Sequence, residues 1–168
     1  MVNFSQDFVV RMKERMTKFS NADRIGNVKS KMTVNIVKGN NLESTANVIG
    51  QNFSWKSGEE GPSPLAYFLS SLGMCQMIHY AEWAASGNVE LDILEIRVEG
   101  EFFVSRPRSF SRISYSVRID SNQDPETIIA LATNASSDCY VTNTLSKACE
   151  VSGQLIVNGK DFGKIGSK

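Results

Sequence analysis

The sequence predicts an α+β protein with antiparallel sheet, and three observations lead to this class. Predicted strands follow one another along the chain as well as alternating with helices, an order that favours α+β over a doubly wound parallel sheet. An uncharged segment at 65–81 predicts a long helix, and residues 91–119 carry the alternation of a β-hairpin. The length of 168 residues suits one domain, which we expect to span 1–168 and to bury about two-thirds of its unfolded surface.

The first predicted elements are a helix and two strands. Residues 3–19 place apolar side chains at helical spacing, which predicts an amphipathic helix that ends at 21–23. Alternating residues predict strands at 28–38 and 44–55, with the turn residues Gly39-Asn40-Asn41 between them. The apolar stripe on the helix is typical of a packing face, and it consists of Phe4, Phe8, Met12, Met16 and Phe19.

The central helix is predicted within the stretch from Gly61 to Gly87, and no residue from Leu65 to Ala81 is charged. A helix that is apolar on every side is a buried helix, because a surface helix shows a polar stripe. Its start is marked by Pro62-Ser63-Pro64, which offers an N-cap serine and a proline at the first helical position. Gly87-Asn88 offers C-cap residues. The segment is too short and too polar for a membrane span, and it presents Cys75 from its middle.

The second half of the chain begins with an antiparallel hairpin at 91–104 and 110–119. Apolar and polar side chains alternate in both strands, so one face is buried and the other faces water. Asp124-Pro125-Glu126 then predicts a helix start with an aspartate N-cap. A short helix is expected at Asn143–Cys149 and a last strand at Gly153–Asn158, before a tail that is expected to fray.

Charge and composition exclude several classes of function. Eighteen basic and eighteen acidic residues give a formal net charge of zero, which indicates neither a nucleic-acid partner nor an anionic membrane surface. The first residues lack the features of a signal peptide, so we expect a cytoplasmic protein. Three widely spaced cysteines in a reducing compartment indicate free, reactive or metal-bound thiols rather than a disulfide framework.

Cys75 needs a partner from elsewhere if it is to react. It lies about three turns into its helix, beyond the reach of the helix dipole, and burial alone raises the pKa of a thiol. His79 and Glu82 share its helix face, and His79 is the only histidine of the chain. A Cys/His pair that generates a thiolate is one interpretation. The other, simpler one is a buried imidazole hydrogen-bonded to a neighbour.

The other two cysteines differ in their surroundings. Cys139 lies where one predicted helix ends and another begins, and a helix N-terminus lowers the pKa of a thiol. Cys149 is interpreted as a small buried apolar side chain. A metal site made of these thiols and His79 lacks the compact spacing of zinc sites, so no metal is predicted.

Two motifs resemble the family of osmotically inducible protein C and organic hydroperoxide resistance proteins, OsmC/Ohr. The first is Gly61-Pro62-Ser63-Pro64 followed by an apolar stretch that ends in Leu72-Gly-Met-Cys75. The second is Cys139-Tyr-Val-Thr-Asn-Thr-Leu145, similar to the family's Cys-Pro-Val-x-x-Thr-Leu with tyrosine for proline. The resemblance covers about residues 28–158, which leaves 1–27 as an N-terminal extension and 159–168 as a tail.

The resemblance implies an OsmC-like fold, a long central helix on antiparallel sheets in an intertwined homodimer with sites at the subunit interface. It implies a thiol-dependent peroxidase that reduces organic hydroperoxides or hydrogen peroxide. Cys75 would become a sulfenic acid and Cys139 would resolve it into a disulfide, which an external dithiol then reduces. No metal or other cofactor is implied.

The chain departs from the peroxidase pattern near the thiol. Leu65 stands where peroxidase members carry a glutamate that holds an arginine over the reactive sulfur. Glu59 and Glu60 are a possible substitute or a solvated loop. The arginine is equally open, and the candidates are Arg24, Arg106 and Arg108.

This departure motivates two other hypotheses. In one, the fold has lost catalysis and serves as a dimeric small-molecule binding module, with an apolar pocket lined by Phe68, Leu72 and Met77. In the other, the chain is a structural domain without a site, and Cys75 is an ordinary buried thiol.

Overall fold

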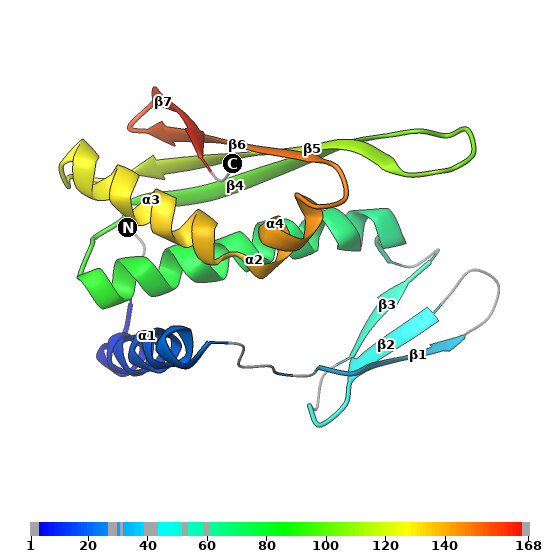
Figure 1. Ribbon diagram of the computed structural model, residues 1–168, viewed down its shortest axis with the longest axis horizontal. Coiled ribbons are helices and arrows are strands. Elements are labelled where there is room, and N and C mark those ends of the chain that lie inside the picture. The colour runs from blue at the N-terminus through cyan, green and yellow to red at the C-terminus, as the bar shows by residue number, and fades with distance from the viewer. Residues whose placement is uncertain are drawn as a thin grey trace. The chain divides into compact units, whose positions relative to one another are not determined.

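The computed structural model describes residues 4–26, 30, 32–38, 44–51, 54–58 and 61–165 (Figure 1). They fall into two compact units, one of residues 1–20 with 69–168 and one of residues 21–68. Helices and strands both alternate and follow one another in the chain, and the α+β class is confirmed. Within the described residues, no helix combines the length and the apolar character needed to cross a membrane.

The larger unit is built on a four-stranded sheet with the order β4-β5-β6-β7. Its strands are β4 (Ile93–Phe102), β5 (Phe110–Asp120), β6 (Glu150–Val157) and β7 (Lys160–Ile165). Strands β4 and β5 pair antiparallel, as the alternation predicts. The inward side chains of β5 are the buried ones: Ile113, Tyr115, Val117 and Ile119.

One pair of strands differs from the predicted antiparallel sheet. Strands β5 and β6 run parallel, with Ile113 opposite Val151. Two helices, α3 (Pro125–Asp138) and α4 (Tyr140–Leu145), lie between these strands in the chain. A crossover of this length carries the chain back to the starting edge of the sheet, so the next strand enters in the same direction.

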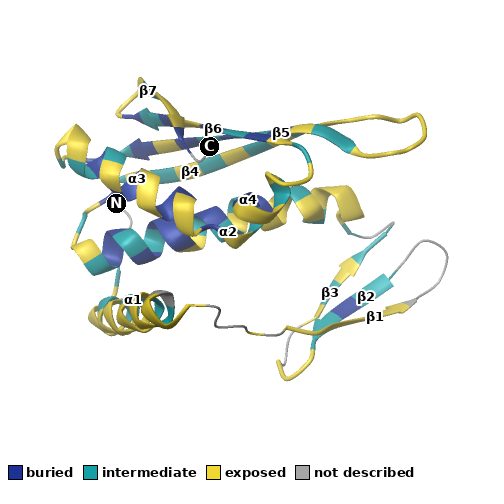
Figure 2. Cartoon of the chain, in the orientation of Figure 1, coloured by how far each residue is buried: buried dark blue, intermediate teal, exposed yellow. Residues whose placement is uncertain are grey.

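Three helices lie on one side of this sheet: α2 (Pro64–Gly87), α3 and α4 (Figure 1). Close contact between α2 and β4 depends on a small residue, because a Cβ at Gly73 would lie 3.3 Å from Val98 Cγ2. The core between the helices and the sheet includes Leu72, Tyr80 and Leu91, all fully buried. Figure 2 shows buried residues along α2 and α3.

The ends of α2 are as predicted. Ser63 Oγ accepts a hydrogen bond from the Ala66 N–H at 3.2 Å. At the other end Asn88 has a positive φ of 53°, and the Val89 N–H donates to the Ala84 carbonyl at 2.8 Å. This is the usual left-handed termination of a helix.

The prediction that α2 is buried on every side is wrong for the single chain. Met74 is 67% exposed and Ile78 is 51% exposed. These residues lie one helical turn apart and therefore share a face. The helix is uniformly apolar, but only one of its faces is covered by its own sheet.

Helix α1 (Gln6–Ile25) runs past the predicted end at 21–23. It stops at Gly26, whose φ of 69° is a left-handed value and whose N–H donates to the Ala22 carbonyl at 2.9 Å. Asparagine and aspartate lower helix propensity only modestly, whereas glycine readily adopts the left-handed conformation that ends a helix.

The smaller unit holds an antiparallel sheet of β1 (Val34–Lys38), β2 (Ser44–Val48) and β3 (Ser54–Ser57). The predicted second strand at 44–55 is therefore two strands. A turn at residues 49–50 separates them, and Gly50 has a φ of 87° there. The predicted turn at 39–41 lies outside the described residues.

Two predictions for the C-terminal part are wrong, one in the position of a helix and one in the structure of the last residues. The short helix expected at 143–149 is α4, which begins directly after Cys139. Residues 160–165 form β7 rather than a frayed tail. Asn158 and Gly159 both have positive φ, at 49° and 76°, and Asn-Gly is the turn that favours a tight hairpin. The predicted helix start is confirmed, because Asp124 Oδ1 accepts from the Thr127 N–H at 2.9 Å.

Candidate functional site

Cys75 and Cys139 come from different elements, and both lie in the larger unit. Cys75 is in the middle of α2 and is partly exposed. Cys139 joins α3 to α4 in an extended conformation, with φ −71° and ψ 108°. Its N–H donates to the Ser136 carbonyl at 3.3 Å, and its own carbonyl accepts from the Asn143 N–H at 3.0 Å. One residue thus ends one helix and begins the next, and its side chain is fully buried.

The structure brings these two thiols together. Cys75 and Cys139 lie close enough for each thiol to shift the pKa of the other, and both are free cysteines. The third free cysteine, Cys149, was predicted to be a small buried apolar side chain; it is partly buried and packs against the core.

The Cys139 sulfur accepts a hydrogen bond at the start of α4. It accepts from the Thr142 N–H at 3.4 Å, as an N-cap side chain of α4 does. The Cys75 thiol, the Thr142 hydroxyl and the amides of Val141 and Thr142 lower the pKa of Cys139 to about 6, although burial opposes them. A hydrogen bond to the charged form of a group favours that form.

Cys75 has the opposite tendency. Its hydrogen bond to Cys139 and its burial raise the pKa of Cys75, and the backbone amides of Val141 and Tyr140 oppose this only in part. The two thiols therefore titrate as a pair, which loses its first proton easily and its second with difficulty.

A buried polar network lies behind Cys139. Gln76 Nε2 donates to Thr142 Oγ1 at 2.7 Å, and both residues are buried. Tyr80 Oη lies 3.5 Å from Ser136 Oγ. The Tyr115 ring lies beside Gly153 of the neighbouring strand, where any Cβ would approach to 2.6 Å of Tyr115 Cε2.

His79 belongs to a second network on the same helix. Its Nδ1 lies 3.1 Å from Glu82 Oε2, and Glu82 Oε1 pairs with an Arg15 guanidinium nitrogen at 2.9 Å. His79 and Glu82 are both buried. The simpler interpretation of His79, an imidazole bonded to a neighbour, is confirmed.

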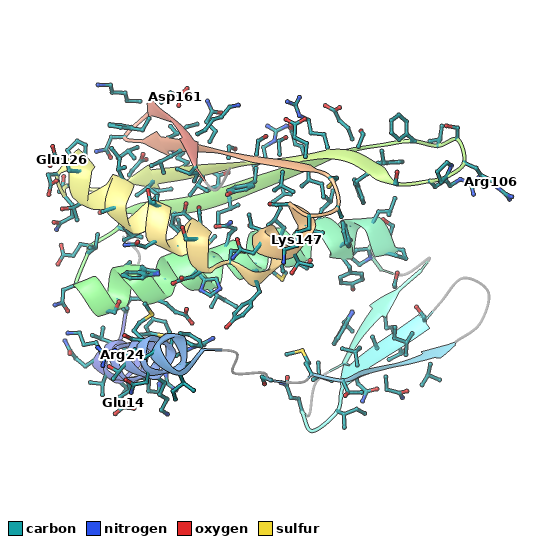
Figure 3. All side chains as sticks on the ribbon, in the orientation of Figure 1. Glu14, Arg24, Arg106, Glu126, Lys147 and Asp161 are labelled. Carbon is teal, nitrogen blue, oxygen red and sulfur yellow. The ribbon has the colours of Figure 1, made fainter. Side chains whose placement is uncertain are left out.

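Arg15 on α1 is not among the arginines that the sequence analysis considered, and its partner is Glu82. The signal that points to it is Glu82 itself, because a buried carboxylate requires a cation or several donors. Of the arginines considered, Arg106 points outward at the far end of the β4–β5 connection (Figure 3), and Arg108 donates to the Val104 carbonyl at 3.1 Å. Arg24 is exposed in the last turn of α1.

The sequence also offered candidate acidic residues, a candidate pocket residue and candidate metal ligands. Glu59 and Glu60 lie outside the described residues. Leu72 is fully buried in the core. Among the residues that the structure describes, no three His, Cys, Asp or Glu side chains come together as a metal site requires.

With this geometry in place, comparison with known proteins identifies the family. The family model of OsmC-like proteins matches residues 57–153, which is more than half of the chain. The chain therefore belongs to the OsmC-like family, as the two cysteine motifs predict. Comparison with the curated proteins gives no significant match.

Solved structures are similar in fold. A hypothetical protein from Aquifex aeolicus VF5 has a TM-score of 0.69 at 13% identity, with 77% of this chain and 98% of that chain covered. An OsmC-like protein from Mycoplasma pneumoniae has 0.66 at 20% identity, covering 77% and 99%. An organic hydroperoxide resistance protein from Elizabethkingia anophelis has 0.61 at 10% identity, covering 79% and 100%. At sequence identities this low, the similarity to these structures shows a shared fold and nothing about activity.

Proposed function

We propose that the protein is a dithiol peroxidase that reduces organic hydroperoxides or hydrogen peroxide through Cys75 and Cys139. The observation that carries the proposal is the proximity of these two thiols, which come from different elements and shift each other's pKa. Adjacent sulfurs can form a disulfide without a large rearrangement of the backbone. Structural relatives that are named organic hydroperoxide resistance proteins support the choice of substrate.

Cys75 is the thiol that meets the peroxide in this proposal, because it is partly exposed whereas Cys139 is fully buried. Its sulfur forms a bond to the terminal peroxide oxygen and the O–O bond breaks. The alkoxide leaves as an alcohol with the thiol proton, and Cys75 becomes a sulfenic acid.

Cys139 then resolves the sulfenic acid. Its thiolate attacks the Cys75 sulfur, the S–S bond forms, and hydroxide leaves as water after it takes up a proton. The peroxide has gained two electrons and the two thiols have lost two. An external dithiol reduces the disulfide and restores the pair.

A homodimer is part of the proposal. The exposed apolar face of α2, which includes Met74 and Ile78, lies on the same helix as Cys75. Exposed apolar patches of this kind mark interaction sites. Light scattering is expected to give twice the chain mass for the native protein and the chain mass for Ile78→Lys, and a monomeric native protein would contradict the dimer.

The experiment on the reaction follows both the peroxide and the thiols. A pulse of cumene hydroperoxide is expected to remove two free thiols and to produce a peptide cross-linked between Cys75 and Cys139 in mass spectrometry. Cys75→Ser is expected to abolish turnover with dithiothreitol as reductant. Cys139→Ser is expected to leave a sulfenic acid that dimedone traps at Cys75.

Cys149→Ser serves as the matched control, since Cys149 lies outside the pair. This variant is expected to consume peroxide like the native protein. The proposal fails if both thiols of the pair remain free after the pulse, or if Cys75→Ser retains full turnover.

A further inference from the structure

A line of contacting side chains runs from α1 through α2 to Tyr140, and it has no part in the reaction as written above. An Arg15 guanidinium nitrogen lies 2.9 Å from Glu82 Oε1, and Glu82 Oε2 lies 3.1 Å from His79 Nδ1. The His79 ring then contacts the Tyr140 ring, with centroids 5.9 Å apart. Glu82 is 1% exposed and His79 is 4% exposed. Burying such groups is costly, so the arrangement calls for a purpose.

The effect of this line of contacts is to fix the ring of His79. Its Nδ1 is bonded to a carboxylate that is itself held by Arg15, and a packed side chain with such a partner keeps one orientation. The planes of the His79 and Tyr140 rings are inclined by 45°. Tilted ring pairs at this separation attract one another. The Tyr140 ring is therefore held in place from beneath.

The other side of the Tyr140 ring is open. Tyr140 is 64% exposed. A single exposed apolar side chain is common on protein surfaces, so its exposure alone indicates nothing. Its location is what distinguishes it, because Tyr140 directly follows Cys139, and the His79 that it contacts lies one helical turn beyond Cys75. The exposed ring is thus a neighbour of the thiol pair.

The start of α4 does not itself require tyrosine. Tyr140 is the first residue of this helix, a position that favours proline because its N–H needs no partner within the helix. Tyrosine lacks that advantage at the first position. The aromatic ring at this position therefore needs another reason, and the contact with His79 shows that the ring is held.

We propose that Tyr140 is a substrate-contacting residue that receives the aromatic ring of an aryl hydroperoxide, and that His79 is a positioning residue that holds Tyr140 for this contact. The inference rests on the proposed function and deepens it, because it names the class of hydroperoxide. In cumene hydroperoxide one carbon atom separates the ring from the peroxide group. A substrate ring on Tyr140 therefore leaves the peroxide within reach of Cys75, the partly exposed thiol.

The contact discriminates between hydroperoxides by the group that they carry. Two aromatic rings attract one another beyond the area that they bury, whereas an alkyl group gains only from burial. The substrate ring keeps its contact with Tyr140 while the O–O bond breaks. An interaction of equal strength in the ground and transition states lowers KM and leaves kcat unchanged.

The test compares cumene hydroperoxide, which carries a ring, with tert-butyl hydroperoxide, which carries none. The quantity measured is the ratio of the two kcat/KM values, with dithiothreitol as reductant. Tyr140→Ala is expected to lower this ratio about tenfold, mainly through a higher KM for cumene hydroperoxide, which is the size of one aromatic contact with its buried area. Tyr140→Phe keeps the ring and is expected to retain the native ratio.

His79→Gln tests the positioning role. Glutamine keeps a donor for Glu82 and removes the ring beneath Tyr140, so we expect a smaller fall of the same ratio. A merely structural role for His79 would change the rates with both peroxides alike and leave their ratio unchanged. Phe103→Ala is the matched control, because it removes a ring that is 56% exposed between β4 and β5, and we expect the native ratio.

A second readout needs no peroxide. Cumyl alcohol, the product left by cumene hydroperoxide, is added to the reduced protein and observed by saturation-transfer NMR. We expect transfer to its ring protons in the native protein and in Tyr140→Phe, and loss of this transfer in Tyr140→Ala.

An equal peroxide ratio for the native protein and Tyr140→Ala would overturn the inference while leaving the proposed function intact. If neither peroxide is consumed, the proposed function fails and the NMR experiment decides the inference: transfer that depends on the Tyr140 ring supports it, and transfer that is absent or independent of the ring overturns it. If circular dichroism shows that His79→Gln does not fold, the two Tyr140 variants decide, since a substitution at so exposed a position leaves the fold intact.

Discussion

Gly153→Ala tests whether the ring of Tyr115 is fixed beside the thiol pair. Gly153 lies on β6 directly opposite Tyr115 on β5. A methyl group at position 153 would lie 2.6 Å from both Cε2 and Oη of Tyr115, whereas carbon atoms in contact lie about 3.5–4.0 Å apart. Either the ring or the strand must therefore move.

The cost follows from the packing of this region. Tyr115 is only 3% exposed, so its ring has no open space to enter. Overpacking a well-packed core costs about 1–3 kcal/mol, and we expect Gly153→Ala to lower the free energy of unfolding by about that amount. The assay is urea denaturation followed by circular dichroism, with equal slopes for native protein and variant.

The matched control is Gly87→Ala. A methyl group there would lie 3.5 Å from Val89 Cγ2, which is ordinary contact, and Gly87 is in the last turn of α2. Since alanine favours helix more than glycine, this variant is expected to be as stable as the native protein or more stable.

A double variant tests whether the clash with the Tyr115 ring causes the loss of stability in Gly153→Ala. Tyr115→Ala removes the obstructing ring, so adding Gly153→Ala to it is expected to cost far less than adding it to the native protein. The reasoning is wrong if Gly153→Ala is as stable as the native protein, or if its cost is the same with and without the tyrosine ring.

Two further expectations concern charge. The reduced protein should gain stability as the pH rises from about 6 to about 8.5, because Cys139, whose pKa is lowered to about 6 in the folded state, ionises there before a thiol of the unfolded chain does. This gain in stability is lost as the pH falls through the pKa that Cys139 has in the folded protein. Urea denaturation of Cys139→Ser over the same pH range should show no such gain. Arg15→Met leaves the buried Glu82 carboxylate without its guanidinium partner, so we expect it to lower the free energy of unfolding by up to about 3 kcal/mol in thermal or urea denaturation. A loss below about 0.5 kcal/mol would contradict this, because it would mean that water replaces Arg15 at no cost.

Local signals account for what the sequence predicted well. The cap residues Ser63 and Asp124 and the positive-φ Asn88 each act within a few residues of themselves, and all three occur at the expected ends of helices. The alternation in β4 and β5 is also local. The Asn158-Gly159 turn was readable in the same way, and overlooking it left β7 unpredicted.

What the sequence left open depends on contacts between distant parts of the chain. The parallel pairing of β5 with β6 depends on where the crossover returns, which no short pattern specifies. The pairing of Arg15 with Glu82 requires α1 to lie against α2. The network of Gln76 and Thr142 likewise exists only once α4 is placed. The chemical roles of Cys75 and Cys139 remain predictions.

The adjacency of these two sulfurs also links oxidation to resistance against unfolding. A bond between Cys75 and Cys139 would close a loop of about 64 residues, and a loop of that size restricts the unfolded chain by about 4 kcal/mol in the chain-entropy model. By thermodynamic linkage, folding favours the disulfide by the same amount. The oxidised protein should therefore outlast the reduced one in denaturant, and the dithiol that recycles it must overcome this bias at every turnover.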